Sequence, residues 1–216
     1  MLMTSVNKAS NWNNIYCGNL ACVGDEHTIK IEIEIVRDRR CEMAVAQVTA
    51  RSCGDCMMCC KLLSIEELEK PAGIWCRHAR SGQGCGIYKD RPNACSHFLC
   101  EWMTNPNLGQ NWKPTSAKFV IFTSSIDQSL NICPDTGYPN AWRQEPYYSV
   151  LKETAARLIE QKKITRVTVG EMNTVLLPDR DEVVRCRPGS QITVIVTNSS
   201  AGTRYDLKVE PPLTHR

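Results

Sequence analysis

A run of cysteines in the first half of the chain holds the largest concentration of chemically competent side chains. Eight of the thirteen cysteines lie between Cys53 and Cys100. Thiolates that bind one metal ion must gather at about 2.3 Å from it, so metal ligands tend to recur two or three residues apart, whereas cysteines that only fill a core do not. We therefore predict a metal site with the ligands Cys53, Cys56, Cys59, Cys60, Cys76, Cys85, Cys95 and Cys100.

The spacing leaves the identity of the metal open between iron and zinc. Cys53, Cys56 and Cys59 match the first three ligands of a bacterial ferredoxin run, in which a remote cysteine completes an iron–sulfur cluster. The candidates for that ligand are Cys76, Cys85, Cys95 and Cys100. A zinc ribbon takes two Cys-x2-Cys knuckles, and the second half of this run contains none. The spacing favours an iron–sulfur cluster or iron, with zinc as the alternative.

Two adjacent cysteines, Cys59 and Cys60, suggest more than one centre. Neighbouring side chains diverge in most backbone conformations, so they cannot easily point at the same ion. We expect Cys53, Cys56 and Cys59 to share one centre and Cys60 to join the second half of the run. A Cys60→Ser variant should then lose only part of the bound metal.

Positive and aromatic side chains within the run are expected to surround the bound group. Several clustered thiolates repel one another, and nearby cations offset that repulsion. Arg77 and Arg91 are our candidates for contacts to the bound group, and Arg91 also precedes the proline that begins a helix. His78 and His97 are expected beside the ligands rather than as ligands. The aromatic residues expected to exclude water are Trp75, Tyr88, Phe98 and Trp102.

The cysteine pattern resembles a known family. It reads Cys-x2-Cys-x2-Cys-Cys from Cys53 to Cys60, and Cys-x-Ile-Tyr-x2-Arg-Pro-x2-Cys-x2-Phe-x-Cys from Cys85 to Cys100. In these motifs the chain resembles the bacterial YkgJ-like family, the putative zinc- or iron-chelating domain, over about a quarter of its length. The resemblance implies a metal-chelating module and no particular reaction. Met57 and Met58 stand where the family often has glycine.

Other functional classes have little support in the sequence. It contains no Gly-rich phosphate loop, nucleophile elbow or His-Glu-x-x-His motif, so catalytic residues stay unknown and enzymatic activity stays open. A net charge of +3 gives no reason to expect nucleic acid, and no apolar run approaches the roughly 20 residues that span a bilayer. The N-terminus does not resemble a signal peptide, which favours a cytoplasmic protein with reduced thiols. Metal ions are the expected partners, and under the zinc alternative the domain is a protein interaction module.

The surrounding sequence predicts an α+β fold: an irregular cysteine-rich module packed with antiparallel strands and one long helix. We divide the chain into an irregular arm at 1–27, a metal-binding domain at 28–163 with its cluster at 53–102, and a small β-rich part at 164–216. Alternating isoleucines predict a strand at 28–36, and residues 41–50 fit either a helix or a strand.

Short helices are expected inside the cluster. Ser64 to Glu67 has the pattern of a capping box, and a second helix should begin near Arg91 and Pro92 and carry Cys95, Phe98, Leu99 and Trp102. Cys95 and Cys100 are not on one face of a helix, so either the helix ends between them or they serve different sites.

Regular elements follow the cluster. Residues 118–123 and 130–133 predict a strand pair, and a helix is expected after Pro146 with an apolar stripe of Tyr147, Leu151, Ala155, Leu158 and Ile159. Five β-branched runs at 164–169, 174–177, 182–185, 192–197 and 205–209 predict a small antiparallel sheet, with a hairpin turn at 198–202.

Overall fold

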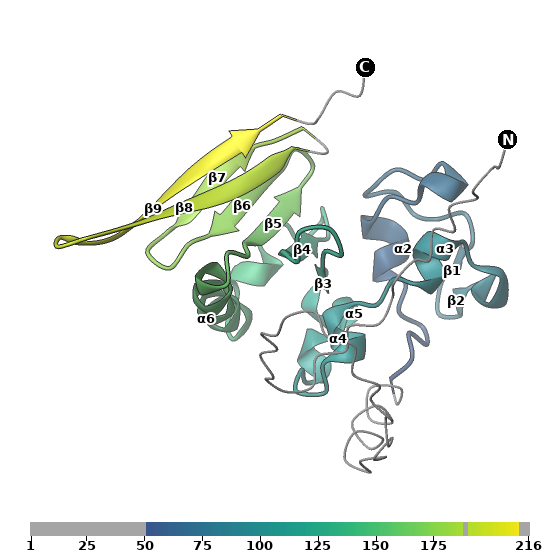
Figure 1. Cartoon of the computed structure of the whole chain (residues 1–216). Coiled ribbons are helices and arrows are strands. Elements are labelled where there is room, and N and C mark those ends of the chain that lie inside the picture. The colour runs from purple at the N-terminus through teal and green to yellow at the C-terminus, as the bar shows by residue number, and fades with distance from the viewer. Residues whose placement is uncertain (1–50, 188–189, 212–216) are drawn as a thin grey trace, which may run out of the picture. The chain divides into compact units, whose positions relative to one another are not determined.

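The computed structural model describes residues 51–187 and 190–211, which all belong to one compact unit, Asp38–Arg216. The predicted arm at 1–27, the strand at 28–36 and the 41–50 segment lie outside the described residues. Within them the predicted α+β class is confirmed, with one long helix and antiparallel strands (Figure 1).

A five-stranded sheet positions the rest of the unit. Its strands, in spatial order, are β3 (Phe119–Thr123), β4 (Leu130–Pro134), β5 (Thr165–Val169), β6 (Met172–Leu176) and β7 (Asp181–Arg185). All neighbours are antiparallel except β4 and β5, which are parallel. Parallel neighbours need a crossover, and helix α6 (Tyr147–Glu160) lies in that connection. One sheet therefore contains strands from both sides of residue 163.

One face of the sheet packs against α6. Leu151 and Ala155 of the helix are buried in a cluster with Val167 of β5 and Leu176 of β6. The predicted helix is confirmed, and Ile159 is buried as well. Tyr147 and Leu158 pack at the margin of the cluster.

Two different parts of the chain pack on the opposite face of the sheet. Successive strand residues point to opposite faces, so Val175 lies on the other face from Leu176, under the hairpin of β8 (Gln191–Ser199) and β9 (Gly202–Glu210). Ile159, near the end of α6, belongs to the same buried cluster. At the other end of the sheet, Val120 of β3 packs against Met58 and Leu62 of the cysteine module. The hairpin turn is confirmed at the predicted position. The predicted C-terminal sheet is divided, because β5 to β7 join the larger sheet and β8 and β9 pair only with each other.

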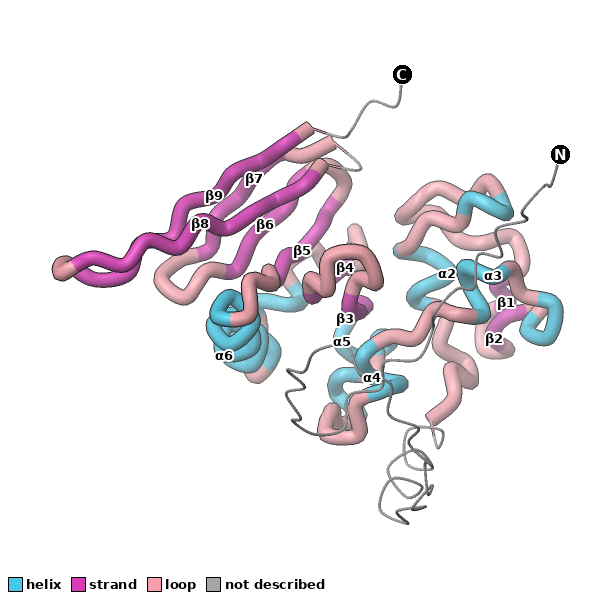
Figure 2. Tube along the Cα trace, in the orientation of Figure 1, coloured by secondary structure: helices cyan, strands magenta, loops and turns pink. Residues whose placement is uncertain are grey.

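The cysteine module, defined here as residues 53–104, contains mainly loops and short elements (Figure 2). In chain order these are α2 (Met58–Leu62), η1 (Glu66–Leu68), β1 (Ala79–Arg80), β2 (Gly84–Cys85), η2 (Tyr88–Asp90), α3 (Asn93–Ser96) and α4 (Glu101–Thr104). Short turns then lead to the sheet through η3 (Gln110–Trp112) and α5 (Pro114–Ala117), and η4 (Ala141–Arg143) precedes α6.

The predicted capping box at Ser64 is wrong. Ile65 precedes the 3-10 turn η1, no side chain caps it, and the Ile65 amide donates to the Lys70 carbonyl at 2.8 Å. The backbone pairing of Ile65 with Lys70 therefore closes this turn, and the Ser64 side chain does not. Glu67 instead accepts a hydrogen bond from the Ala94 amide at 3.1 Å and ties η1 to α3.

The predicted helix from Arg91 to Trp102 is interrupted. Helix α3 ends at Ser96, the backbone is extended at Cys100, and α4 begins at Glu101. In a continuous helix, Cys95 and Cys100 would point about 140° apart around the axis. The break removes that constraint and lets both side chains reach one cavity.

Candidate metal centre

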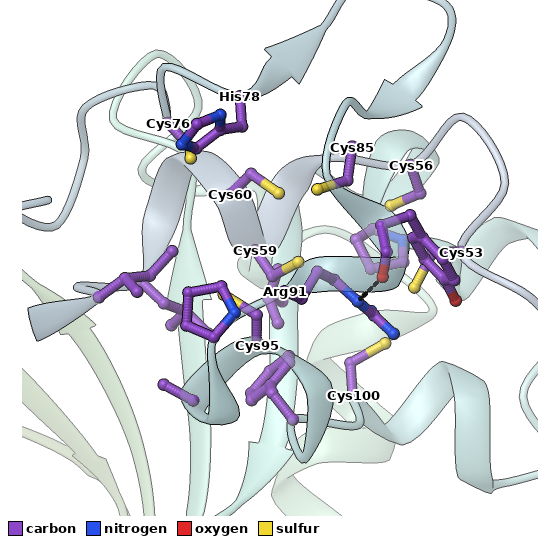
Figure 3. A pocket seen from close by; sticks show the side chains of 18 of the residues that line it. Cys53, Cys56, Cys59, Cys60, Cys76, His78, Cys85, Arg91, Cys95 and Cys100 are labelled. Carbon is purple, nitrogen blue, oxygen red and sulfur yellow. Dashed lines mark hydrogen bonds between the residues drawn. The ribbon is translucent and has the colours of Figure 1, made fainter. Parts of the chain in front are cut away.

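All eight predicted ligands line a single cavity of about 150 Å³ (Figure 3). They come from segments up to 47 residues apart, so the tertiary structure and not local spacing brings them together. The ten cysteines in the described part of the chain are all free thiols. The remaining two, Cys133 and Cys186, do not line this cavity.

The first four cysteines are held by a turn and the short helix α2. The Cys56 amide donates to the Cys53 carbonyl at 2.8 Å, with Gly54 at φ +53° inside the turn. A Cβ at Gly84 would lie 2.6 Å from the Gly54 carbonyl oxygen, so only glycine lets β2 approach this closely. The close approach brings Cys85 to the cavity that the first turn lines.

The second half of the run is attached to α2 through its backbone. The Cys76 amide donates to the Cys60 carbonyl at 3.0 Å. Pairing of β1 with β2 places Ala79 opposite Cys85. Cys100 and Cys56 both pack against the buried cluster of Met58, Leu62 and Val120.

Burial raises the pKa of four of the eight thiols in the cavity. It is the largest cause that raises the pKa of Cys53, Cys56, Cys95 and Cys100. Cys59 and Cys60 form a hydrogen-bonded pair, and this bond raises the pKa of Cys59 and lowers the pKa of Cys60 to about 7. A bound metal would supply the positive charge that stabilises thiolates here.

Lys70 is a cation at the site that the sequence analysis missed. Its side chain is buried, with 6% of its surface exposed, and Nζ donates to the carbonyls of Lys61 at 3.2 Å, Pro71 at 2.9 Å and Leu63. Burial lowers the pKa of Lys70, and the nearby thiols, Cys76 first among them, oppose that effect. Lys70 does not stand at a diagnostic spacing from any cysteine, so no sequence signal marks it.

Of the two arginines predicted to contact the bound group, the structure places Arg91 at the cavity. Its Nε donates to the Tyr88 carbonyl at 2.8 Å, and its guanidinium lies 3.8 Å from the centre of the Tyr88 ring. Cys53 and Cys60 both experience its charge, and Figure 3 shows Arg91 extending between the cysteines. Arg77 is exposed and does not line the cavity; its Nη2 donates to the Leu68 carbonyl at 3.3 Å.

Of the aromatic residues and histidines predicted beside the ligands, some line the cavity and others do not. His78, Tyr88, Phe98 and Trp102 line the cavity. His97 and Trp75 do not, and Trp75 is half exposed with the Lys61 ammonium 5.5 Å from its ring centre. The indole N–H of Trp102 is buried and has no hydrogen-bond partner within residues 51–187 and 190–211.

The donor set fits a thiolate-bound metal group in its chemistry. Within residues 51–187 and 190–211, no three His, Cys, Asp or Glu side chains are arranged to hold a metal ion. The thiols thus line a cavity and do not form a closed coordination shell.

No family model, curated protein or solved structure matched the chain.

The resemblance to the YkgJ-like family therefore stays a prediction. Among the described helices, none has the length and apolar character needed to cross a bilayer. The longest, α6, has 14 residues.

Proposed function

We propose that this protein binds a metal group through the eight cysteines of the module, and that the group is an iron–sulfur cluster. One observation carries the proposal: cysteines from Cys53 to Cys100, distributed over six separate segments of the module, all line the same cavity. Cysteines that served only as small core residues would have no reason to converge. Soft thiolates select iron–sulfur clusters and zinc over hard cations such as magnesium.

The cavity has room for more than a single metal ion. Its volume is about 150 Å³, and an apolar cavity of that volume elsewhere holds benzene, which has six heavy atoms. The spacing of Cys53, Cys56 and Cys59 also matches a cluster-binding run. When bound, such a cluster supplies one-electron redox chemistry.

The charges around the cavity suit an anionic group. Thiolate-bound clusters carry net negative charge, and the Lys70 ammonium and the Arg91 guanidinium are both close to the thiols. Tyr88, Phe98 and Trp102 reduce the access of water to the cavity, which strengthens these electrostatic interactions. Reduced thiols fit a cytoplasmic location, which is part of the same proposal.

The test is anaerobic purification of the full chain, followed by metal and sulfide analysis and an absorption spectrum. We expect iron with a matching amount of acid-labile sulfide and broad visible absorbance. A Cys56→Ser, Cys59→Ser double variant should lose most of this iron, whereas Cys186→Ser, which removes a cysteine outside the cavity, should retain it. Absence of bound metal in the wild-type chain, before and after reconstitution with iron and sulfide, would contradict the proposal.

A second candidate function is a protein interaction module held together by zinc. Ile74, Trp75 and Leu99 of the module are each at least 50% exposed, and exposed apolar side chains of this size are common at binding surfaces. The same purification separates the two functions. A colourless protein with zinc and without sulfide would support the interaction module instead.

A further inference from the structure

We propose that the eight thiols form two separate centres of four, with Cys53, Cys56, Cys59 and Cys100 in the first centre and Cys60, Cys76, Cys85 and Cys95 in the second. This inference rests on the proposed function and assigns its ligands. It applies to iron–sulfur clusters and to zinc, because both take four cysteine ligands per centre.

Contacts around Cys100 define the first centre. Cys56 and Cys100 both pack against the apolar cluster of Met58, Leu62 and Val120. The thiols whose charges act on Cys100 are Cys53 and Cys56. The hydrogen bond from the Cys56 amide to the Cys53 carbonyl holds these two residues in one turn. Cys100 is 40 residues or more from its partners in sequence, so spacing alone did not assign it.

Contacts around Cys95 define the second centre. The thiols that act on Cys95 are Cys60, Cys76 and Cys85. The Cys76 amide donates to the Cys60 carbonyl at 3.0 Å, which fixes the backbones of these two residues together. Cys85 lies on β2, whose partner strand β1 begins three residues after Cys76. In Figure 3, Cys76 and Cys60 lie on the side of the cavity away from Cys53 and Cys100.

The boundary between the two sets passes between Cys59 and Cys60. Consecutive residues on α2 project about 100° apart around the helix axis. Besides acting on each other, Cys59 experiences the charges of Cys53 and Cys56, and Cys60 those of Lys70 and Arg91. Cys60 also acts on Cys53, and Lys70 on Cys59, so the two sets of thiols adjoin at this boundary.

Each proposed centre has a polar group of its own. Lys70 lies near Cys76, Cys60 and Cys95 of the second centre and near Cys59 of the first, so its buried positive charge acts mainly on the second centre. Trp102, two residues after Cys100, lines the cavity, and its buried indole N–H has no partner among the residues that the structure describes. Buried donors are almost always satisfied, so an acceptor on a group bound in the cavity would satisfy this one. An anionic sulfur of the first centre would provide that acceptor.

Two matched single substitutions test the partition. Cys100→Ser removes a ligand of the first centre and Cys95→Ser removes a ligand of the second, while Cys186→Ser is the control outside the cavity. With four thiolates per centre, each of the two variants should retain about half of the wild-type metal, and the Cys95→Ser, Cys100→Ser double variant almost none. A single shared centre predicts that either substitution alone affects all of the metal.

A measurement on the unmodified chain covers the case in which a variant does not fold. Native mass spectrometry during slow removal of metal by a chelator should show a half-loaded species between the full and the empty protein. Loss of all metal in one step from a metal-containing wild-type chain would overturn the partition and leave the proposed function intact. A wild-type chain that binds neither iron nor zinc would overturn both.

Discussion

The cysteine module and the five-stranded sheet differ in how much apolar side chain they bury. The sheet buries large apolar side chains completely, with Phe119, Ile132 and Leu176 each at most 1% exposed. In the module the buried apolar residues are few, and Ile74, Trp75 and Leu99 are instead exposed. Most of its backbone is in loops and single turns. The module has a cavity lined by eight thiols, whereas the sheet has a packed apolar core.

This difference indicates where the stability of each region comes from. Burying one large apolar side chain contributes about 1.5–3 kcal/mol, and the sheet has many such residues. The module has too few for its length, whereas binding of a structural metal contributes about 10–16 kcal/mol in small zinc domains. We infer that the sheet folds on apolar burial and that the module depends on its bound metal.

The largest expected effect is that of metal removal. Treatment of the purified chain with a strong chelator and a reductant should lower the melting temperature of the module by many degrees, because the free energy of metal binding is also folding free energy. Hydrogen exchange measured by mass spectrometry should show loss of protection in residues 53–104 and retained protection in β4 and β5. Equal protection in both regions after complete metal loss would contradict the comparison.

A core substitution in the sheet should lower stability without changing the amount of bound metal. Ile132 is fully buried on the inner strand β4, and Ile132→Ala should lower the free energy of unfolding by about 2–5 kcal/mol. Chemical denaturation checks this value, and metal content per chain should stay unchanged. Val183→Ala on the edge strand β7, where the side chain is 55% exposed, is the control and should change stability by less than about 0.5 kcal/mol.

An ion pair between the two regions should have an intermediate effect. Lys61 of α2 donates to both carboxylate oxygens of Asp135, which follows β4, at 2.7 and 2.8 Å. The Asp135 side chain is 9% exposed, so Asp135→Asn leaves Lys61 without its anionic partner and should lower the free energy of unfolding by about 1–3 kcal/mol. The control is Asp179→Asn, at an exposed pair with Arg180.

The same pair gives a pH dependence of known sign. Burial raises the pKa of the Asp135 carboxyl, but the hydrogen bonds from Lys61 and the Gly137 amide lower it more, so its pKa lies below the ordinary value. A lowered folded-state pKa contributes stability above the unfolded pKa of about 3.9, and this contribution is lost as the pH falls through the folded pKa. Denaturation curves of the wild-type chain and Asp135→Asn should therefore converge at acid pH. A constant difference down to that pH would exclude this role for Asp135.

The smallest expected effect is at a surface pair of the sheet. Arg185 and Glu171 are 2.7 Å apart, with side chains 77% and 51% exposed. Water and salt screen such pairs, so Glu171→Gln should change the free energy of unfolding by less than about 1 kcal/mol. Thermal melts at low and high salt check this. A larger loss would mean that the sheet margin depends on charge and not on apolar burial.

Local sequence pattern was a good guide in the sheet and a poor one in the module. The apolar stripe at Leu151 and Ala155 predicted α6, and the β-branched runs predicted the positions of the strands. These elements repeat at a fixed period because one face of each is buried. The capping pattern at Ser64 failed, because the bridge between Ile65 and Lys70 closes that turn in another way.

The sequence by itself determined which residues have the chemistry of metal ligands, since thiol type and spacing are properties of the chain. It also determined the fold class and the long helix, because both follow from periodic burial. Only the tertiary structure decided that all eight thiols share one cavity, that Arg91 and Lys70 lie beside them, and that Arg77 faces outward. These features depend on which loops of the module pack against α2, and the loops have no repeating sequence pattern. Their positions are set by contacts between segments distant in sequence, such as that between Gly84 and Gly54, and a local sequence pattern does not predict such contacts.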